Sequence, residues 1–320
     1  MSMLKYNWGI LGLGNIAHEF CDNMLKIGRP YAVASRDLSR AQQFQKKYSA
    51  EKSYGSYEEL LSDPVVDIVY VATVNSEHYS NIKASLLAGK HVICEKAIIG
   101  SIDKLTELAG IAQESNLLLA EAMTIFHMPI TNHIQKTIKD GMIGKLKYVS
   151  ADLGSLKEDD PDSRFFNKDL GGGSMLDIGT YGLSWIYSFI EDIPTKTVCT
   201  SSTHAGGADE SWSIAMKTAD DVICNVNLTF RAKLPKRAIV AGEKAYYEVY
   251  NYVRAEVADL VFPDGRREHI KAGKTDDALL YEICNVERAI ETNDYTICRF
   301  GTTLNVVNTM DHLLKSTAEE

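Results

Sequence analysis

An acidic residue and a tyrosine lie four positions apart in the glycine-rich stretch Leu170–Trp185. The three consecutive glycines at 171–173 let the backbone take conformations closed to other residues and lie against a flat ligand. The segment from 174 to 181 predicts the opening of a helix, with Asp177 and Tyr181 on one face. A carboxylate beside a phenol is a hydrogen-bond and proton-transfer pair, which makes both residues candidates for catalysis. The alternative stays open that they only satisfy each other on a buried helix.

A second motif lies near the N-terminus, between a short strand predicted at Tyr6–Leu11 and a helix predicted to run to about Lys26. Its pattern is G-x-G-x-x-A, typical of a dinucleotide-binding turn. Gly12 permits the tight turn, Gly14 lets a pyrophosphate approach the backbone, and the helix N-terminus faces the anion. The cofactor-binding residues predicted here are Gly12, Gly14, Asn15 and Ile16.

The end of the second predicted strand, Tyr31–Ser35, carries no acid for the ribose hydroxyls. Ser35 and Arg36 stand there instead, and Arg40 follows one helical turn later. A hydroxyl and guanidinium groups suit the 2′-phosphate of NADP, so we predict NADP rather than NAD. The alternative is that Arg36 is an exposed arginine before a helix whose N-cap is Asp37.

The apolar strand predicted at Asp67–Thr73 ends at the edge where parallel sheets bind ligands. Thr73 and Asn75 are therefore predicted cofactor contacts, with Asn75 at the nicotinamide ribose. His78 is a candidate contact as well. A histidine at the start of a helix, bonded to backbone, is the equally good alternative.

The strand predicted at His91–Glu95 is followed directly by Lys96. A lysine straight after an acid at the carboxyl end of a sheet strand is placed to direct its ammonium into the cofactor crevice. We predict that Glu95 and Lys96 contact the cofactor and that Lys96 is also catalytic. The alternative is a surface lysine that caps the strand.

Strands and helices alternate through the first 122 residues, which predicts a doubly wound, parallel Rossmann sheet as domain 1–122. Further elements expected in it are the helices Leu38–Tyr48, a helix ending at Leu87 and Ile102–Ser115, and the strand Leu117–Glu121.

The pattern changes after residue 122, and residues 123–320 predict an α+β domain with a large, open, mainly antiparallel sheet and helices on one face. Long strands follow Leu146, and Val222–Phe230 alternates between apolar and polar residues. The expected helices begin at Pro129, Ala278 and Thr302, and residues 263–265 predict a hairpin turn. The whole chain is thus of the α/β class.

The net charge of −9 disfavours nucleic acid and anionic membrane as partners. The six cysteines have no C-x-x-C spacing and stand mostly in apolar runs, which favours buried free thiols over disulfides or a zinc site. No metal ligand set is predicted. Without a signal peptide or an apolar run of transmembrane length, we expect a cytoplasmic protein.

Three motifs give the chain a resemblance to the Gfo/Idh/MocA family of oxidoreductases over nearly its whole length. They are VASRDLSRA at 33–41, GKHVICEK at 89–96 and RFFNKDLGGGSMLDIGTY at 164–181. The most similar branch is that of dimeric dihydrodiol dehydrogenases and NADP-dependent xylose dehydrogenases. The resemblance implies that Lys96, Asp177 and Tyr181 are catalytic, with other branches carrying histidine in place of Tyr181.

The resemblance also implies NADP-dependent hydride transfer to or from a secondary alcohol of a sugar, polyol or cyclic diol. It further implies a homodimer or higher homo-oligomer, joined through strands between about Lys196 and Ile270. Two rival functions remain: a catalytically silent NADP-binding regulator or sensor, and an NAD-dependent dehydrogenase.

Two departures from the family pattern affect the site. Ala97 follows Lys96 where the family has proline, often after a cis peptide bond. Because a non-proline cis bond costs roughly 3 kcal/mol, we expect a trans bond and a slightly displaced Lys96. Phe126 stands where the branch carries arginine, and His127 follows it, so we expect an altered substrate pocket.

Overall fold

The computed structural model describes residues 3–317, which divide into two compact units. Unit 1 comprises the residues up to Met123 together with Asp276–Gly301. Unit 2 comprises Thr124–Thr275 together with the residues from Thr302 onward. The α/β class predicted from the sequence is confirmed, and each unit is described by itself.

The described strands of unit 1 form one parallel sheet in the order β3-β2-β1-β4-β5-β6. This order reverses direction beside β1, as in doubly wound dinucleotide-binding sheets, and ligands bind such sheets at the carboxyl edge of the switch point. The predicted Rossmann sheet is confirmed. The strands are β1 (Trp8–Leu11), β2 (Ala32–Ala34), β3 (Lys52–Tyr54), β4 (Ile68–Val71), β5 (His91–Glu95) and β6 (Leu119–Ala122).

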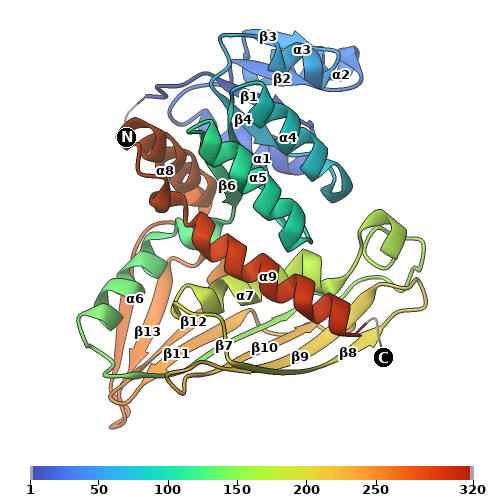
Figure 1. Cartoon of the computed structure of the whole chain (residues 1–320). Coiled ribbons are helices and arrows are strands. Elements are labelled where there is room, and N and C mark those ends of the chain that lie inside the picture. The colour runs from blue at the N-terminus through green and yellow to red at the C-terminus, as the bar shows by residue number, and fades with distance from the viewer. Residues whose placement is uncertain (1–2, 318–320) are drawn as a thin grey trace. The chain divides into compact units, whose positions relative to one another are not determined.

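Helices connect successive strands of this sheet (Figure 1). Asp37 caps α2 as predicted, because its carboxylate accepts hydrogen bonds from the N–H groups of Ser39 and Arg40. The helices of unit 1 are α1 (Asn15–Met24), α2 (Leu38–Tyr48), α3 (Tyr57–Leu61), η1 (Asn75–Glu77), α4 (His78–Leu87), α5 (Ile102–Glu114), α8 (Ala278–Thr292) and η7 (Tyr295–Cys298).

Strand β3 and helix α3 were not predicted. Strand β3 has three residues, Lys-Ser-Tyr, and lies at the edge of the sheet, so it lacks the apolar run of an inner strand. Helix α3 has five residues, too few to show helical periodicity, although Ser56 caps it by accepting from the N–H group of Glu59.

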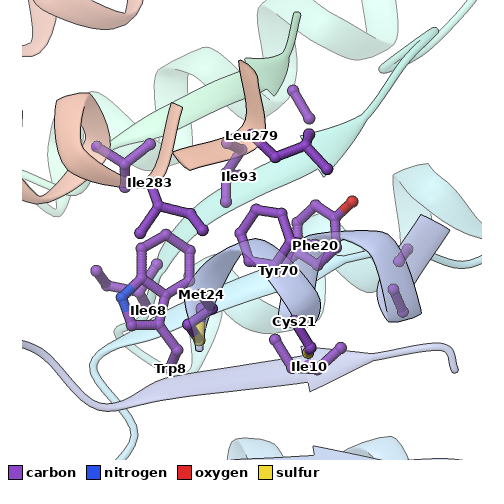
Figure 2. Packing of buried hydrophobic residues seen from close by; sticks show 14 of the residues in the cluster. Trp8, Ile10, Phe20, Cys21, Met24, Ile68, Tyr70, Ile93, Leu279 and Ile283 are labelled. Carbon is purple, nitrogen blue, oxygen red and sulfur yellow. The ribbon is translucent and has the colours of Figure 1, made fainter. Parts of the chain in front are cut away.

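The core of unit 1 joins β1, α1 and β4 to the returning helix α8 (Figure 2). The rings of Phe20 and Tyr70 are stacked, with centroids 3.8 Å apart, and Trp8 lies 5.6 Å from Phe20. Leu279 and Ile283 of α8 are buried in the same cluster. Helix α8 is therefore part of this core although it lies more than 150 positions after β6 in the sequence.

A carboxylate fixes α8 to the start of the chain. Glu287 accepts hydrogen bonds from the backbone N–H groups of Lys5 and Tyr6 and from the indole Nε1 of Trp8, at 3.1–3.3 Å. The first boundary between the units, after Met123, adjoins the division expected between 122 and 123. Because Asp276–Gly301 also belong to unit 1, one division point in the sequence does not separate the two units.

The described strands of unit 2 form a sheet in the order β14-β13-β12-β11-β7-β10-β9-β8. Its neighbours are antiparallel except for the central pair β7 and β10, so the predicted mainly antiparallel sheet is confirmed. The strands are β7 (Leu146–Gly154), β8 (Lys196–Thr203), β9 (Asp209–Lys217), β10 (Ile223–Thr229), β11 (Arg237–Gly242), β12 (Tyr246–Tyr250), β13 (Val257–Val261) and β14 (Arg267–Lys271).

The helices α6, α7 and α9 lie on the same side of this sheet (Figure 1). The side chains that β10 directs to the helix side, Cys224, Val226 and Leu228, are buried, and the intervening Asn225 and Asn227 are only half-buried. The predicted alternation is confirmed. The helical elements are η2 (Thr124–Phe126), α6 (Pro129–Lys139), η3 (Lys168–Leu170), the π-helical turn η4 (Met175–Gly179), α7 (Thr180–Tyr187), η5 (Tyr252–Arg254), η6 (Thr275–Asp277) and α9 (Phe300–Thr317).

All six cysteines are free thiols, and four of them are buried, as predicted. Burial raises the pKa of Cys224 to about 12, which keeps this thiol protonated and inert at neutral pH. Within residues 3–317, no helix combines the length and the apolar character needed to cross a bilayer.

Candidate functional site

The glycine turn between β1 and α1 has the shape that the motif predicts. Gly12 has a φ of +85°, and a Cβ there would lie 2.7 Å from the carbonyl oxygen of Ala72. Only glycine fits this position. A Cβ at Gly14, in contrast, would meet no heavy atom of the described chain within 4 Å. Packing within the described chain therefore does not explain Gly14, and the space beside it is open, as the dinucleotide-binding motif predicts.

The first turn of α1 offers backbone donors to an anion. Within the described chain, no side chain caps this helix, and its first turn, which begins at Asn15 and Ile16, holds no acidic residue. Arg40 of α2 contacts the glycine turn that precedes this helix, because its Nη2 donates to the carbonyl oxygen of Leu13 at 2.6 Å. The guanidinium of Arg40 is thereby held beside the glycine turn.

The end of β2 presents the hydroxyl and guanidinium predicted there. Ser35 is buried, and its Oγ accepts from the N–H group of Asp37 at 3.2 Å. Arg36 is exposed. Arg36 and Arg40 both lower the pKa of Tyr57, although burial raises that pKa overall, so both positive charges act on the same partly buried phenol. Arg36 and Arg40 therefore lie near the same phenol, and Arg40 also contacts the glycine turn.

The residues after β4 divide between exposed and buried positions. Asn75 is exposed at the start of η1, and the Thr73 hydroxyl accepts from Asn81 Nδ2 at 3.1 Å. His78 is fully buried, with Nε2 3.2 Å from the Thr73 carbonyl oxygen and Nδ1 3.1 Å from the carbonyl oxygens of Ala97 and Ile98. The backbone-bonded alternative for His78 is therefore the one found. Burial lowers its pKa, and both ring nitrogens face backbone rather than a ligand.

The segment after Lys96 is held from two sides. His78 contacts two of its carbonyl oxygens, and the Glu121 carboxylate accepts from the N–H group of Ile98 at 3.0 Å. Glu121 is itself fully buried at the end of β6. The Lys96–Ala97 peptide bond is cis, so the expectation of a trans bond after Lys96 is wrong. The expectation considered only the local energy of the peptide bond. The contacts of this segment with His78 and Glu121 join distant parts of the sequence, and that local energy does not predict them.

Glu95 and Lys96 are half-buried at the carboxyl end of β5. The phenol of Tyr70, in the neighbouring strand β4, donates to Glu95. Burial and the negative charge of Glu95 raise the pKa of Tyr70 well above its usual value, so this phenol stays a proton donor. All predicted cofactor contacts thus belong to unit 1, where the strand ends and adjoining turns of the parallel sheet carry them.

Two of the three glycines at 171–173, Gly172 and Gly173, pack closely against other residues of unit 2, whereas a Cβ at Gly171 would meet no heavy atom of the described chain within 4 Å. A Cβ at Gly172 would lie 2.7–2.9 Å from three carbonyl oxygens, those of Arg164, Phe165 and Asn167. A Cβ at Gly173, whose φ is +131°, would lie 2.2 Å from the Asp209 carboxylate. Gly172 and Gly173 therefore let the segment 164–173 fold on itself and approach β9, which makes their role in unit 2 one of close packing.

The start of the next helix is fixed by Asp209. Its Oδ2 accepts from Ser174 Oγ at 2.8 Å, from the N–H group of Met175 at 2.7 Å and from Trp212 Nε1 at 2.7 Å. The sequence predicted a regular helix here, and that expectation is wrong for Met175–Gly179, which form a π-helical turn. One extra residue in a turn rotates all that follows by about 100°. Gly179 lets the side chains of Met175 and Leu228 pack against this turn, since a Cβ there would lie 2.7 Å from Met175 Sδ and 3.0 Å from Leu228 Cδ1.

Asp177 lies in the π-helical turn, and Tyr181 lies in the first turn of α7 directly after it. Both are partly exposed. Lys157 places its ammonium 4.0 Å from Asp177 Oδ2. Asp177 and Tyr181 are thus presented by one short segment of unit 2, and Lys96 is presented by unit 1.

Three of these residues were not predicted as part of the site. Glu121 carried a usable signal, because a carboxylate in an apolar strand beside the strand of Lys96 suggests a buried anchor. Asp209 and Lys157 carried none, since Asp209 is 34 positions from Met175 and Lys157 is 20 positions from Asp177, and each lies in an ordinary polar context.

Two family models match the chain. The model described as "Oxidoreductase family, NAD-binding Rossmann fold" matches residues 6–123. The model described as "GFO/IDH/MocA C-terminal domain" matches residues 131–248. Trans-1,2-dihydrobenzene-1,2-diol dehydrogenase from Danio rerio is 31% identical over 255 residues, which cover 77% of this chain and 75% of that protein.

The chain belongs to the Gfo/Idh/MocA oxidoreductase family.

Another relative in this family is D-xylose 1-dehydrogenase (NADP(+)) from Hypocrea jecorina, 37% identical over 65% of this chain and 60% of that protein. Among solved structures, the aldose-aldose oxidoreductase from Caulobacter crescentus complexed with glycerol has a TM-score of 0.88 at 21% identity. It covers 99% of this chain and 98% of that one. The family resemblance seen in the sequence is therefore confirmed, and these structures share the Gfo/Idh/MocA fold.

The contacts of Asp209 predict a stability effect. Asp209→Ala leaves the hydroxyl of Ser174, the N–H group of Met175 and the Trp212 indole without their acceptor. We expect the free energy of unfolding to fall by about 2–4 kcal/mol, measured by urea denaturation. The control is Asp220→Ala, at an exposed position before β10, with an expected change within about 0.5 kcal/mol. Equal stabilities of the two variants would contradict the anchoring role.

Proposed function

We propose that this protein is an NADP(H)-dependent dehydrogenase or reductase that acts on a secondary alcohol or carbonyl of a sugar, polyol or cyclic diol. One observation carries the proposal. In this chain, Lys96, Asp177 and Tyr181 all stand at the motif positions of the family, and contacts within each unit hold the segments that bear them. The relatives named as dihydrodiol and xylose dehydrogenases support the substrate class. The open space beside Gly14 in the glycine turn supports dinucleotide binding.

The dinucleotide fits the residues present in unit 1. Gly12, Gly14, Asn15 and Ile16 would hold its pyrophosphate at the start of α1, and Ser35, Arg36 and Arg40 its 2′-phosphate. Thr73, Asn75, Glu95 and Lys96 would hold the nicotinamide riboside. When bound, the nicotinamide supplies or accepts the hydride. His78 acts as a positioning residue through its contacts with Thr73 and Ala97.

The proton moves through Tyr181 in this proposal. The phenolate form takes the proton of the substrate hydroxyl during oxidation, and the phenol returns it to the substrate oxygen during reduction. A free phenol has a pKa near 10, too high for a base at neutral pH. The family resemblance implies that the ammonium of Lys96 favours the phenolate and hydrogen-bonds the substrate oxygen, and that Asp177 orients substrate hydroxyls or Lys96.

The rival function is a catalytically silent regulator or sensor that binds NADP. The supported Lys96 segment and the presence of Asp177 and Tyr181 favour the enzyme. Turnover of any member of a panel of aldoses and vicinal diols decides for the enzyme, whereas tight NADPH binding without turnover decides for the regulator. A cytoplasmic location is part of the proposal, because six free cysteines suit a reducing compartment.

Arg36 tests the choice of cofactor. A charge-assisted contact of this arginine with phosphate contributes about 2 kcal/mol, so we expect a preference of about thirtyfold for NADPH over NADH. Arg36→Ala removes most of it without weakening NADH binding. Both dissociation constants are measured by fluorescence titration at one ionic strength. The control is Arg29→Ala, which removes an exposed arginine of unit 1 that pairs with Glu51. Equal NADPH and NADH affinities in the unmodified protein would refute the preference.

Tyr181 and Lys96 test the proton transfer. Tyr181→Phe keeps the ring and removes the exchangeable proton, so we expect kcat to fall about 10²–10⁴-fold with NADPH affinity nearly unchanged. Lys96→Met keeps the aliphatic stem and also lowers kcat. Its remaining activity requires higher pH, because the phenolate loses the neighbouring positive charge. The two losses do not add in the double variant, since both residues serve one step.

The matched control for Tyr181 is Tyr187→Phe on the same helix. Tyr187 is buried and bonded to Thr309 through its hydroxyl at 2.6 Å, so its loss affects stability and leaves kcat unchanged. A Tyr181→Phe enzyme that melts at a lower temperature but keeps the kcat of the unmodified enzyme would end the proposed mechanism.

We also propose that the protein forms at least a dimer through the face of the unit 2 sheet opposite the helices. Strands β8–β14 lie within the predicted range, and this face carries the exposed apolar side chains Val198, Ile223 and Tyr250 among polar ones. Light scattering at micromolar concentration is expected to give a dimer or larger species, and Ile223→Asp to shift it toward monomer. A monomeric unmodified protein at that concentration would refute the proposal.

A further inference from the structure

Lys157 is held beside Asp177 by both its backbone and its side chain. Its N–H group donates to the carbonyl oxygen of Phe230 at 2.9 Å, which continues the pairing of β7 with β10 beyond the strand. Its ammonium lies 3.9 Å from the centroid of the Phe165 ring and 5.5 Å from that of Phe230. A cation over aromatic faces is attracted by their quadrupoles, so the two rings define where this ammonium lies.

The side chains of Lys157 and Asp177 keep limited contact with solvent, with exposed fractions of 20% and 30%. Their charged atoms are 4.0 Å apart, at the outer limit of an ion pair. A hydroxyl oxygen about 2.8 Å from each can accept from the ammonium and donate to the carboxylate, with an angle of about 90° at the oxygen. The spacing therefore suits a hydroxyl group bound between opposite charges.

We propose that Lys157 is a substrate-binding and specificity-determining residue that, with Asp177, binds a hydroxyl group next to the reacting carbon. The proposal rests on the proposed function, because it takes the substrate to be a sugar or diol. It adds a substrate-binding residue and a substrate preference to that function. The enzyme favours a vicinal diol over the corresponding monohydric alcohol, and Lys157 contributes to that preference. A substrate without the second hydroxyl leaves both charges without this bridging partner.

Alternative roles for this lysine predict other results. A purely structural lysine that packs on Phe165 contributes through its stem and ring contact, so its loss affects stability and all substrates equally. Arg164 provides the matched comparison, since its guanidinium carbon lies 4.5 Å from the same ring centroid while the residue is exposed. Arg164→Met removes a cation from Phe165 and leaves the pair of Lys157 and Asp177 intact.

The test compares trans-1,2-cyclohexanediol with cyclohexanol as substrates, with NADP⁺ as the oxidant, in the unmodified enzyme and three variants. Lys157→Met keeps the stem and removes the charge. We expect its kcat/KM for the diol to fall about 10–100-fold, mainly through KM, because one charge-assisted hydrogen bond is lost. The value for cyclohexanol stays within twofold. Lys157→Arg restores most of the diol activity, and Arg164→Met changes neither substrate.

The possible outcomes separate this assignment from the function on which it rests. If the unmodified enzyme oxidises the diol and Lys157→Met does so equally well, the role of Lys157 is refuted and the dehydrogenase remains. The same holds if Lys157→Met weakens both substrates by the same factor. If the unmodified protein binds NADPH in a fluorescence titration but oxidises neither compound nor any aldose of a panel, the proposed function and this assignment fail together.

Discussion

Carboxylates that accept hydrogen bonds from backbone N–H groups hold the segments on which the chemistry depends. Glu121 accepts from Ile98 and so fixes the turn after Lys96, while Asp209 accepts from the first residue of the π-helical turn. Glu287 does the same for the residues before β1. Such charge-assisted bonds are roughly twice as strong as neutral ones. At Glu287, both carboxylate oxygens accept, so an amide there would direct its N–H groups against a donor, which favours a carboxylate.

Burial of Glu287 opposes the bonds that its carboxylate accepts. For Glu287, burial raises the pKa, and the bonds from Trp8, Tyr6 and Lys5 lower it. Several donors converge on this carboxylate and offset the cost of burying its charge. Removing one donor leaves the buried charge only partly satisfied. The rigidity of each segment is therefore a property of a group of contacts rather than of one bond.

The sequence predicted the elements whose signal is local. The strand at 91–95 and the helix at 38–48 have the predicted bounds, because the first is a short apolar strand and the second has an N-cap at Asp37. The glycine turn and the alternation in β10 were predicted for the same reason. Edge strand β3 and helix α3 were missed because both are too short for a periodic pattern.

The remaining features depend on contacts between distant parts of the sequence. The π-helical turn requires Asp209 from β9, the backbone contacts of His78 require the segment 97–98, and Lys157 becomes part of the site through Phe165 and Asp177. The contacts of Asp209 with Met175, of His78 with Ala97 and of Lys157 with Asp177 each join residues 19 or more positions apart, beyond the reach of a local pattern. The catalytic roles of Lys96, Asp177 and Tyr181 were inferred from motif positions, and the structure supplies the contacts that support the segments bearing them.

The return of α8 to unit 1 has a consequence for how the protein is made. The ribosome releases β1 to β6 first, but Leu279 and Ile283, which cover the cluster around Trp8 and Phe20, emerge only after the whole sheet of unit 2. Until then the nascent N-terminal segment exposes an apolar surface, and Glu287 is not yet present to accept its bonds. The first unit to begin synthesis is thus completed only by one of the last helices, so its native core cannot close until nearly the whole chain has been made.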